Sequence, residues 1–192
     1  MVGYFTDNES LLDNKLGISD PEALQAAEQD IVAEKTARLL DEAHPHNFDF
    51  EYLKHIHKVL FEDIYDFAGQ IRTVDITKSD SRTPFAYAQF IVSESKRVFD
   101  ELNTKSYLLD IEKETYISEI ANLSAELNAV HPFREGNGRA IRLFPIILAD
   151  NAGYLLDYSQ VSSEELITAD KRAFEGDTSL LLAVYKKAVI TY

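Results

Sequence analysis

The sequence predicts a mainly α-helical fold of about six to eight helices with one short β-hairpin. Apolar residues recur every three to four positions along most of the 192 residues, which is the spacing of one helix face. Hydrophobic residues make up 45% of the chain and include 11 Phe and 10 Tyr, enough for a substantial core. Alternation of period two is confined to residues 71–76. We therefore expect one all-α domain over residues 1–192, with a hairpin inserted in it.

Two helices are expected after a polar N-terminal segment, residues 1–18. The first should begin at a capping box formed by Ser19 and Glu22, with Pro21 in its first turn, and end near Ala43. The second should run over residues 49–69, because its apolar residues share a helical spacing and a glycine often follows a helix end. These apolar residues are Leu53, Ile56, Leu60, Ile64 and Phe67.

The hydrophobic period changes to two immediately after Gly69. Side chains 71, 73 and 75 alternate with side chains 72, 74 and 76, and the following stretch KSDS is rich in turn-forming residues. The sequence therefore predicts a β-hairpin over residues 72–84.

Helical spacing returns in the second half of the chain, over residues 87–102 and 111–129. A strongly apolar segment through Leu148 follows, and Ser162 and Glu165 have the spacing of another capping box. The final stretch, SLLLAVYKKAVITY, is expected to form the last helix.

Pro145 lies inside the apolar segment that is expected to be helical. A proline there removes one backbone hydrogen bond and can cost about 3 kcal/mol. We expect either a kink or a helix that the core holds in place, and no disturbance of Arg142 one turn earlier.

Charge and composition exclude several classes of function. With 33 acidic and 19 basic residues the formal net charge is −14, so a nucleic acid or an anionic membrane is not an expected partner. The absence of cysteine excludes disulfides and thiolate metal sites. The N-terminus has no secretory signal pattern, and no apolar run approaches 18 residues. We expect a bacterial cytoplasmic protein, or one delivered into the cytoplasm of another cell.

Positive charge is concentrated in one stretch, HPFREGNGRAIR, residues 131–142. Gly136 and Gly138 allow the backbone to approach a ligand closely. A helix that begins at Asn137 or Gly138 leaves its first N–H groups without partners, which makes an anion site. Arg139 and Arg142 are three residues apart, so both can reach further phosphates. Several linked anionic groups indicate a nucleotide triphosphate.

The same stretch contains the other groups needed for phosphoryl-type transfer. Glu135 offers a hard oxygen ligand for Mg²⁺. His131 can act as a general base near neutral pH. Phe133 lies between polar positions and is expected to point inward and anchor the loop. Each feature alone also fits a tight turn, a helix cap or a surface ion pair, but together they supply the separate parts of such a reaction.

The remaining histidines, His44, His46, His55 and His57, occur as pairs two residues apart. Residues with this spacing point to different faces of a helix, so a zinc site is not expected. His55 and His57 are expected to be partly exposed beside Ile56.

The stretch HPFREGNGRAIR resembles the signature of the Fic family, His-x-Phe-x-Asp/Glu-Gly-Asn-Gly-Arg-x-x-Arg, at every fixed position. The upstream stretch LFEDIYDFAGQIRTVDITK resembles the Fic segment that leads into a hairpin called the flap, and LLDNKLGISDPEALQAAE resembles the start of bacterial Fic proteins. The resemblance covers about residues 11–160.

This resemblance implies a protein adenylyltransferase, which moves AMP from ATP to a Tyr, Ser or Thr hydroxyl of a target protein and releases pyrophosphate. His131 would deprotonate the hydroxyl, and Glu135 would hold the Mg²⁺ between the α- and β-phosphates. Positions 136–138 (Gly136, Asn137, Gly138) would cradle the α- and β-phosphates, and Arg139 and Arg142 would hold the β- and γ-phosphates.

The resemblance also assigns roles to the hairpin. Residues 73–77 (Thr73, Val74, Asp75, Ile76, Thr77) would pair with the main chain of the target segment. Lys78 and Ser79 would contact the nucleotide.

Three alternative functions stay open from the sequence. A Doc-type kinase shares the fold and transfers the γ-phosphate, but such proteins have Lys in place of Gly138 and lack the flap. Transfer of UMP or phosphocholine is a second alternative, and a non-catalytic nucleotide-binding module is a third.

Regulation is the last expectation from the family resemblance. Many Fic enzymes are inhibited by a helix with the pattern Ser/Thr-x-x-x-Glu-Gly/Asn, whose glutamate pairs with the second motif arginine. Glu175 precedes a glycine here, but position 171 is Lys171 rather than Ser or Thr. We therefore expect a small antitoxin protein to supply the glutamate, or an inhibitory helix outside this sequence, and an unpaired Arg142 in the chain alone.

Overall fold

Seven α-helices and one small sheet make up the chain in the computed structural model, which describes residues 11–43, 45, 47–77 and 84–191. This confirms the expected mainly helical class. The helices are α1 (Pro21–Asp41), α2 (Phe50–Phe61), α3 (Ile91–Thr104), α4 (Lys113–Val130), α5 (Asn137–Asn151), α6 (Ser163–Phe174) and α7 (Ser179–Ala188). The two strands are β1 (Tyr154–Leu156) and β2 (Val189–Thr191).

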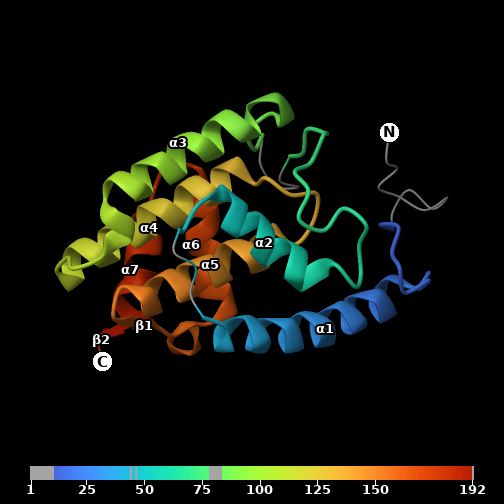
Figure 1. Ribbon diagram of the computed structural model, residues 1–192, viewed down its shortest axis with the longest axis horizontal. Coiled ribbons are helices and arrows are strands. Elements are labelled where there is room, and N and C mark those ends of the chain that lie inside the picture. Colours follow the sequence, from blue (N-terminus) through green and yellow to red (C-terminus); the bar gives the residue numbers. More distant parts are fainter. Residues whose placement is uncertain (1–10, 44, 46, 78–83, 192) are drawn as a thin grey trace.

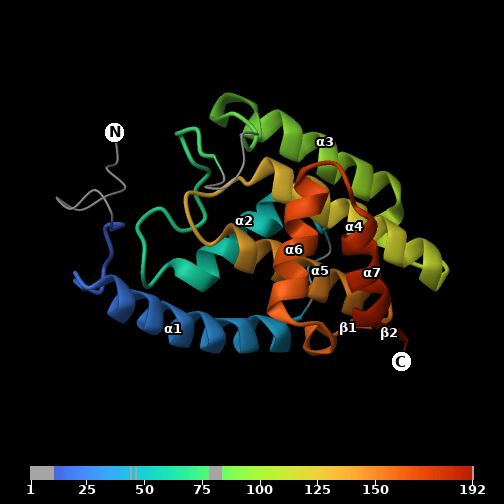
Figure 2. The same ribbon diagram turned by 180° about the vertical axis from the view of Figure 1, so that it is seen from behind.

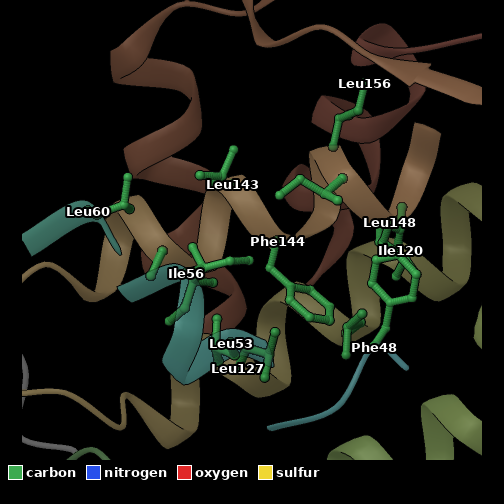
Figure 3. Packing of buried hydrophobic residues seen from close by; sticks show 14 of the residues in the cluster. Phe48, Leu53, Ile56, Leu60, Ile120, Leu127, Leu143, Phe144, Leu148 and Leu156 are labelled. Carbon is green, nitrogen blue, oxygen red and sulfur yellow. The ribbon is translucent and has the colours of Figure 1, made fainter. Parts of the chain in front are cut away.

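Helix α5 lies in the middle of the fold and packs on α2 and α4 (Figure 1). Helix α1 runs along one edge, and α6 and α7 cover the face seen in Figure 2. The ring of Phe144 in α5 is fully buried and meets the ring of Phe48 at a centroid distance of 6.0 Å (Figure 3). It also meets the ring of Phe99, at 5.5 Å. Both pairs are close to perpendicular, the favoured geometry for buried aromatic rings. The helix that starts at the motif is therefore fixed by the core.

Pro145 lies inside α5 without ending it. The proline cannot donate to the carbonyl of Ile141, yet its neighbours Phe144 and Ile147 are almost fully buried. Unfolding this turn would expose those side chains, so their burial offsets the missing hydrogen bond. The expectation that the core holds the helix is confirmed.

Two helix boundaries differ from the sequence predictions. Asp20, not Ser19, caps α1, and its carboxylate accepts the Ala23 N–H at 2.8 Å. Helix α2 ends at Phe61 rather than near Gly69. Residues 62–69 form turns instead, in which Ile64 and Phe67 are still buried. The three-to-four spacing of the apolar residues there reflects burial and not helix.

The predicted hairpin is represented in the described residues by a single antiparallel bridge between Thr77 and Pro84. The two arms, residues 72–77 and 84–87, are called the flap arms below. The regular sheet lies elsewhere: β1 pairs with β2 in an antiparallel register that places Leu155 opposite Ile190. The prediction that the final stretch is entirely helical was therefore wrong, because its last residues pair with β1.

Candidate active site

A tight loop, residues 131–136, joins the end of α4 to the start of α5. His131 caps α4 in the left-handed conformation, with φ 48° and ψ 63°, and its N–H donates to the Leu127 carbonyl at 3.0 Å. Few residues other than glycine adopt this conformation, although histidine does so more often than most. The loop therefore sends the chain back across the end of α4 at the point where the histidine lies.

Two side chains lock the loop internally. Phe133 is fully buried, which confirms that it points inward. The Asn137 side-chain amide donates to the Phe133 carbonyl at 2.7 Å, and its oxygen accepts the Phe133 N–H at 2.8 Å. The Asn137 side chain is 3% exposed and occupied by these two bonds, so this residue can offer a ligand only its backbone N–H.

The start of α5 provides the predicted anion site. The predicted start near Asn137 is confirmed, with Gly136 at the N-cap and a φ of +75°. Within the described residues, the N–H groups of Asn137 and Gly138 donate to no acceptor, while those of Arg139 and Ala140 donate to the Gly136 carbonyl. Two unpaired amides at the positive end of a helix dipole attract an anion.

The imidazole of His131 has a defined tautomer. Its Nδ1 lies 3.3 Å from the Asn128 carbonyl, which can only accept, so the ring proton is on Nδ1. Nε2 then has the lone pair, as a general base requires. The Phe85 ring stacks on the imidazole with a centroid distance of 3.7 Å and an interplanar angle of 14°.

A polar cavity of about 410 Å³ brings the motif and the flap arms together. Its lining residues are Ile76, Thr77, Phe85, His131, Arg134, Glu135, Asn137 and Gly138. Of the flap residues singled out from sequence, Ile76 and Thr77 thus line the cavity, whereas Thr73, Val74 and Asp75 are exposed and do not. Asp75 instead accepts the Ala88 N–H at 2.7 Å, which ties the first flap arm to the residue that follows the second arm. Lys78 and Ser79 lie outside the described residues.

Arg134 of the motif lines this cavity, whereas Arg139 and Arg142 are not among its described lining residues. Arg139 forms an ion pair with Glu28 of α1, and its guanidinium lies 4.7 Å from the centre of the Phe61 ring. Glu28 also accepts the Tyr65 hydroxyl. The sequence analysis missed Glu28, which fixes Arg139 against α1 instead of leaving it oriented by a ligand alone.

Arg142 is held differently. Its Nε donates to the Gly138 carbonyl at 2.9 Å, and no carboxylate of the described chain pairs with it. The guanidinium lies beside Gly138, where an added Cβ would be 2.7 Å from one of its terminal nitrogens. The glycine thus leaves room for the arginine head, and the availability of Arg142 to an outside glutamate stays a prediction.

Glu135 is placed to serve a cation. Its carboxylate accepts the Gly136 N–H at 2.9 Å, lies 3.8 Å from the Arg139 guanidinium and is 48% exposed at the cavity. No cluster of three metal-ligating side chains occurs among the described residues. One carboxylate beside a phosphate site is the donor set that Mg²⁺ accepts, since it keeps water and phosphate oxygens as its other ligands. The residues present therefore fit Mg²⁺ bound together with a nucleotide.

His57 is a site residue that the sequence analysis placed wrongly. It was expected to be partly exposed, but it is fully buried, stacked on the Phe133 ring at 3.8 Å. Its Nδ1 accepts the Gly69 N–H and its Nε2 faces the Glu135 carbonyl, both at 2.9 Å. Burial lowers the pKa of His57 to about 4, so it is neutral, with its proton on Nε2. Its spacing of four from both Leu53 and Phe61 was the signal that it belongs to the buried helix face.

The buried neutral His57 predicts a dependence of stability on pH. In the unfolded chain the pKa of His57 is near 6.5, so the unfolded state binds a proton below that pH. The folded state binds this proton only below about pH 4. Stability should therefore fall as the pH falls from about 6.5 to about 4, by roughly 3 kcal/mol from this group. Urea unfolding of wild type and His57→Gln across this range measures the difference, with exposed His55→Gln as the control. Parallel curves for wild type and His57→Gln would contradict it.

Comparison with known proteins confirms the family resemblance. The sequence profile of the Fic/DOC family matches residues 47–149, from just before α2 to near the end of α5. Protein adenylyltransferase VbhT of Bartonella schoenbuchensis is 34% identical over 184 residues, which cover 95% of this chain and 38% of VbhT. The probable protein adenylyltransferase Fic of Escherichia coli K12 is 32% identical over 186 residues, which cover 97% of this chain and 91% of that protein. The chain belongs to the Fic/DOC family.

Solved structures agree with this Fic assignment over nearly the whole chain. The BepC effector protein of Bartonella tribocorum with bound AMPPNP has a TM-score of 0.92 at 28% identity, covering 98% of this chain and 97% of that one. A Bartonella quintana Fic domain with bound ADP has a TM-score of 0.95 at 27% identity and covers 98% of this chain and 94% of that one. Within the described residues, no helix of this Fic chain is long and apolar enough to cross a lipid bilayer.

Proposed function

We propose that this Fic chain is a protein adenylyltransferase that moves AMP from ATP to a Tyr, Ser or Thr hydroxyl of a target protein. The observation that carries the proposal is one cavity that contains both the imidazole of His131 and the unpaired amides at the start of α5. Relatives named protein adenylyltransferase and structural neighbours with bound AMPPNP and ADP support the same activity.

In this proposal each group has a separate task. The N–H groups of Asn137 and Gly138 bind phosphate oxygens, and Arg142 holds the end of the triphosphate. Glu135 would hold Mg²⁺, and the bound ion would neutralise phosphate charge. His131 Nε2 takes the proton of the target hydroxyl, whose oxygen then bonds to the α-phosphorus. The bond from the α-phosphorus to the bridging oxygen breaks, and pyrophosphate leaves with that electron pair. Positioning and charge stabilisation supply most of the rate.

Arg139 has two roles in this proposal, one in the fold and one in binding the ligand. Its ion pair with Glu28 and its place over Phe61 occupy one side of the guanidinium. A guanidinium has five donors, so N–H groups beyond those paired with Glu28 are left for a β-phosphate. Arg139 thus ties α1 to the phosphate site as well as binding the ligand.

The chief alternative is a Doc-type kinase, which would transfer the γ-phosphate. Gly138 favours AMP transfer, because Doc-type kinases have Lys in place of this glycine. ATP labelled on the α- or the γ-phosphate, incubated with the chain, Mg²⁺ and a cell lysate, distinguishes the cases. Protein labelled from the α-position is the expected result. Protein labelled from the γ-position would mean a kinase, and nucleotide binding with no label would mean a non-catalytic module. UTP and CDP-choline as donors test the remaining transfers.

We also propose that a separate antitoxin protein restrains the enzyme by supplying a glutamate to Arg142. The chain alone should then be active and label itself from α-labelled ATP, and Arg142→Ala should be much less active. Equal labelling by the two forms would contradict this role for Arg142. Two settings fit the activity, the bacterial cytoplasm and the cytoplasm of a second cell, since several solved relatives are described as VirB-translocated effector proteins.

A further inference from the structure

Arg72 makes an unusual set of contacts beneath the cavity. The residue is 1% exposed, and its guanidinium makes four hydrogen bonds to backbone carbonyls. Nε donates to His131 at 2.8 Å, Nη1 to Val74 at 2.8 Å, and Nη2 to Ala86 at 2.5 Å and to Val130 at 3.3 Å. Its own N–H donates to the Pro132 carbonyl at 2.9 Å. One side chain thereby contacts three separate segments.

These segments are the two flap arms and the end of α4. Val74 belongs to the first arm, Ala86 to the second, and Val130 and His131 to the helix terminus. The last carbonyls of an 18-residue helix have no partners within it and form the negative end of its dipole, so a buried cation is stabilised there. Because the guanidinium is planar with donors at fixed angles, it sets the distances between the arms and the helix.

The geometry of the base depends on these bonds. His131 holds a left-handed conformation that a residue with a side chain adopts at a cost. Its N–H is fixed by Leu127 and its carbonyl by Arg72. Phe85, which stacks on the imidazole, precedes Ala86, which Arg72 also holds. The backbone of His131 and the backbone next to Phe85 are thus bonded to the same guanidinium. The Ala86 N–H also donates to the Ala129 carbonyl at 3.0 Å, which ties the second arm to α4.

We propose that Arg72 is a positioning residue for AMP transfer. It keeps His131 and both flap arms in a fixed arrangement relative to one another. This rests on the proposed function, in which the flap presents the target hydroxyl to His131 Nε2. Its guanidinium bonds to the flap arms and the end of α4, whereas the amides proposed to bind phosphate belong to Asn137 and Gly138. We therefore expect ATP binding to depend on Arg72 far less than transfer does. Loss of Arg72 should therefore separate transfer from ATP binding.

The test compares Arg72→Gln and Arg72→Lys with wild type, below the melting temperature of each variant. Self-labelling from α-labelled ATP gives the transfer rate, and calorimetry gives the Kd for Mg-ATP. A displacement of about 1 Å at a reacting group can cost roughly 100-fold in rate, so we expect that loss for Arg72→Gln and about tenfold for Arg72→Lys. The Kd should stay within about threefold in both. Arg97→Gln is the control, because Arg97 is half exposed and pairs only with Glu94 and Glu126 in the described contacts.

A second readout does not need activity. Nitrogen-15 NMR of the imidazole should find the His131 proton on Nδ1 in wild type and a mixture of tautomers in Arg72→Gln. A folded Arg72→Gln that transfers within threefold of wild type and keeps the tautomer would overturn the proposal. So would parallel losses of rate and ATP affinity, or failure of both variants to fold, since each assigns Arg72 to the fold alone. A tautomer change in a chain whose wild type transfers no AMP would instead refute the proposed function and leave Arg72 as the group that orients His131.

Discussion

Replacing His131 with alanine is expected to lower AMP transfer by about 10³-fold, within the range for loss of a general base. The imidazole Nε2 is the group that can take the hydroxyl proton, and the phosphate-binding amides belong to other residues. The affinity for Mg-ATP should therefore be almost unchanged. Mass spectrometry of lysate proteins after reaction with wild type and with His131→Ala gives the transferred group, the modified residue and the size of the loss.

His55→Ala is the matched control for this result, because His55 is an exposed histidine of α2 far from the loop in sequence. It should transfer AMP at the wild-type rate. If His131→Ala kept more than a tenth of the activity, or lost ATP binding together with activity, His131 would be a structural residue and not the base.

Replacing Gly136 with alanine is expected to cost about 3 kcal/mol of stability and at least tenfold in ATP affinity. Gly136 has a φ of +75°, a conformation that costs an L-residue roughly 1–2 kcal/mol. In addition, a Cβ there would overlap the Phe61 ring, and overpacking of a core typically costs about 1–3 kcal/mol. The loop must shift to relieve the overlap, which moves the amides of Asn137 and Gly138. Denaturant unfolding and calorimetry with Mg-ATP measure the two effects.

The chain offers a control that separates strain from overlap. Gly153 has a φ of +79°, but a Cβ there would meet nothing within 4 Å, so Gly153→Ala should cost only the conformational part. Adding Phe61→Leu to Gly136→Ala should recover part of the loss, as a coupling energy in a double-mutant cycle. If Gly136→Ala and Gly153→Ala lost the same free energy of unfolding, the Phe61 ring would have moved to make room for the new methyl group.

Local patterns in the sequence were sufficient to locate the motif and to predict most of the helices. The start of α5 followed from a glycine-rich turn before an apolar run, and the inward position of Phe133 followed from its polar neighbours. The end of α2 could not be predicted in this way, because Ile64 and Phe67 continue the apolar spacing in turns that are also buried. Periodicity reports which side chains face the core, and a helix is only one way to place them there.

The supporting contacts of the site were beyond sequence reasoning for a different reason. The bond from His57 to Glu135 joins residues 78 apart, and the bond from Arg72 to His131 joins residues 59 apart. Neither partner has a pattern that names the other. Arg72 in particular appeared in the sequence only as a member of an alternating stretch, since nothing local indicates that its acceptors are main-chain carbonyls from three segments.

The opposite protonation of two imidazoles has a practical consequence. His57 bears its hydrogen on Nε2 and His131 on Nδ1. His131 begins the loop, and His57 of α2 contacts the same loop through Phe133 and Glu135. One nitrogen-15 spectrum therefore reports on two places. The His57 signals report on the hydrogen bond to the Glu135 carbonyl, and the His131 signals report on the reacting ring. A ligand or partner that disturbs only one side of the loop would shift the signals of one histidine. The unchanged signals of the other histidine would then be the internal reference.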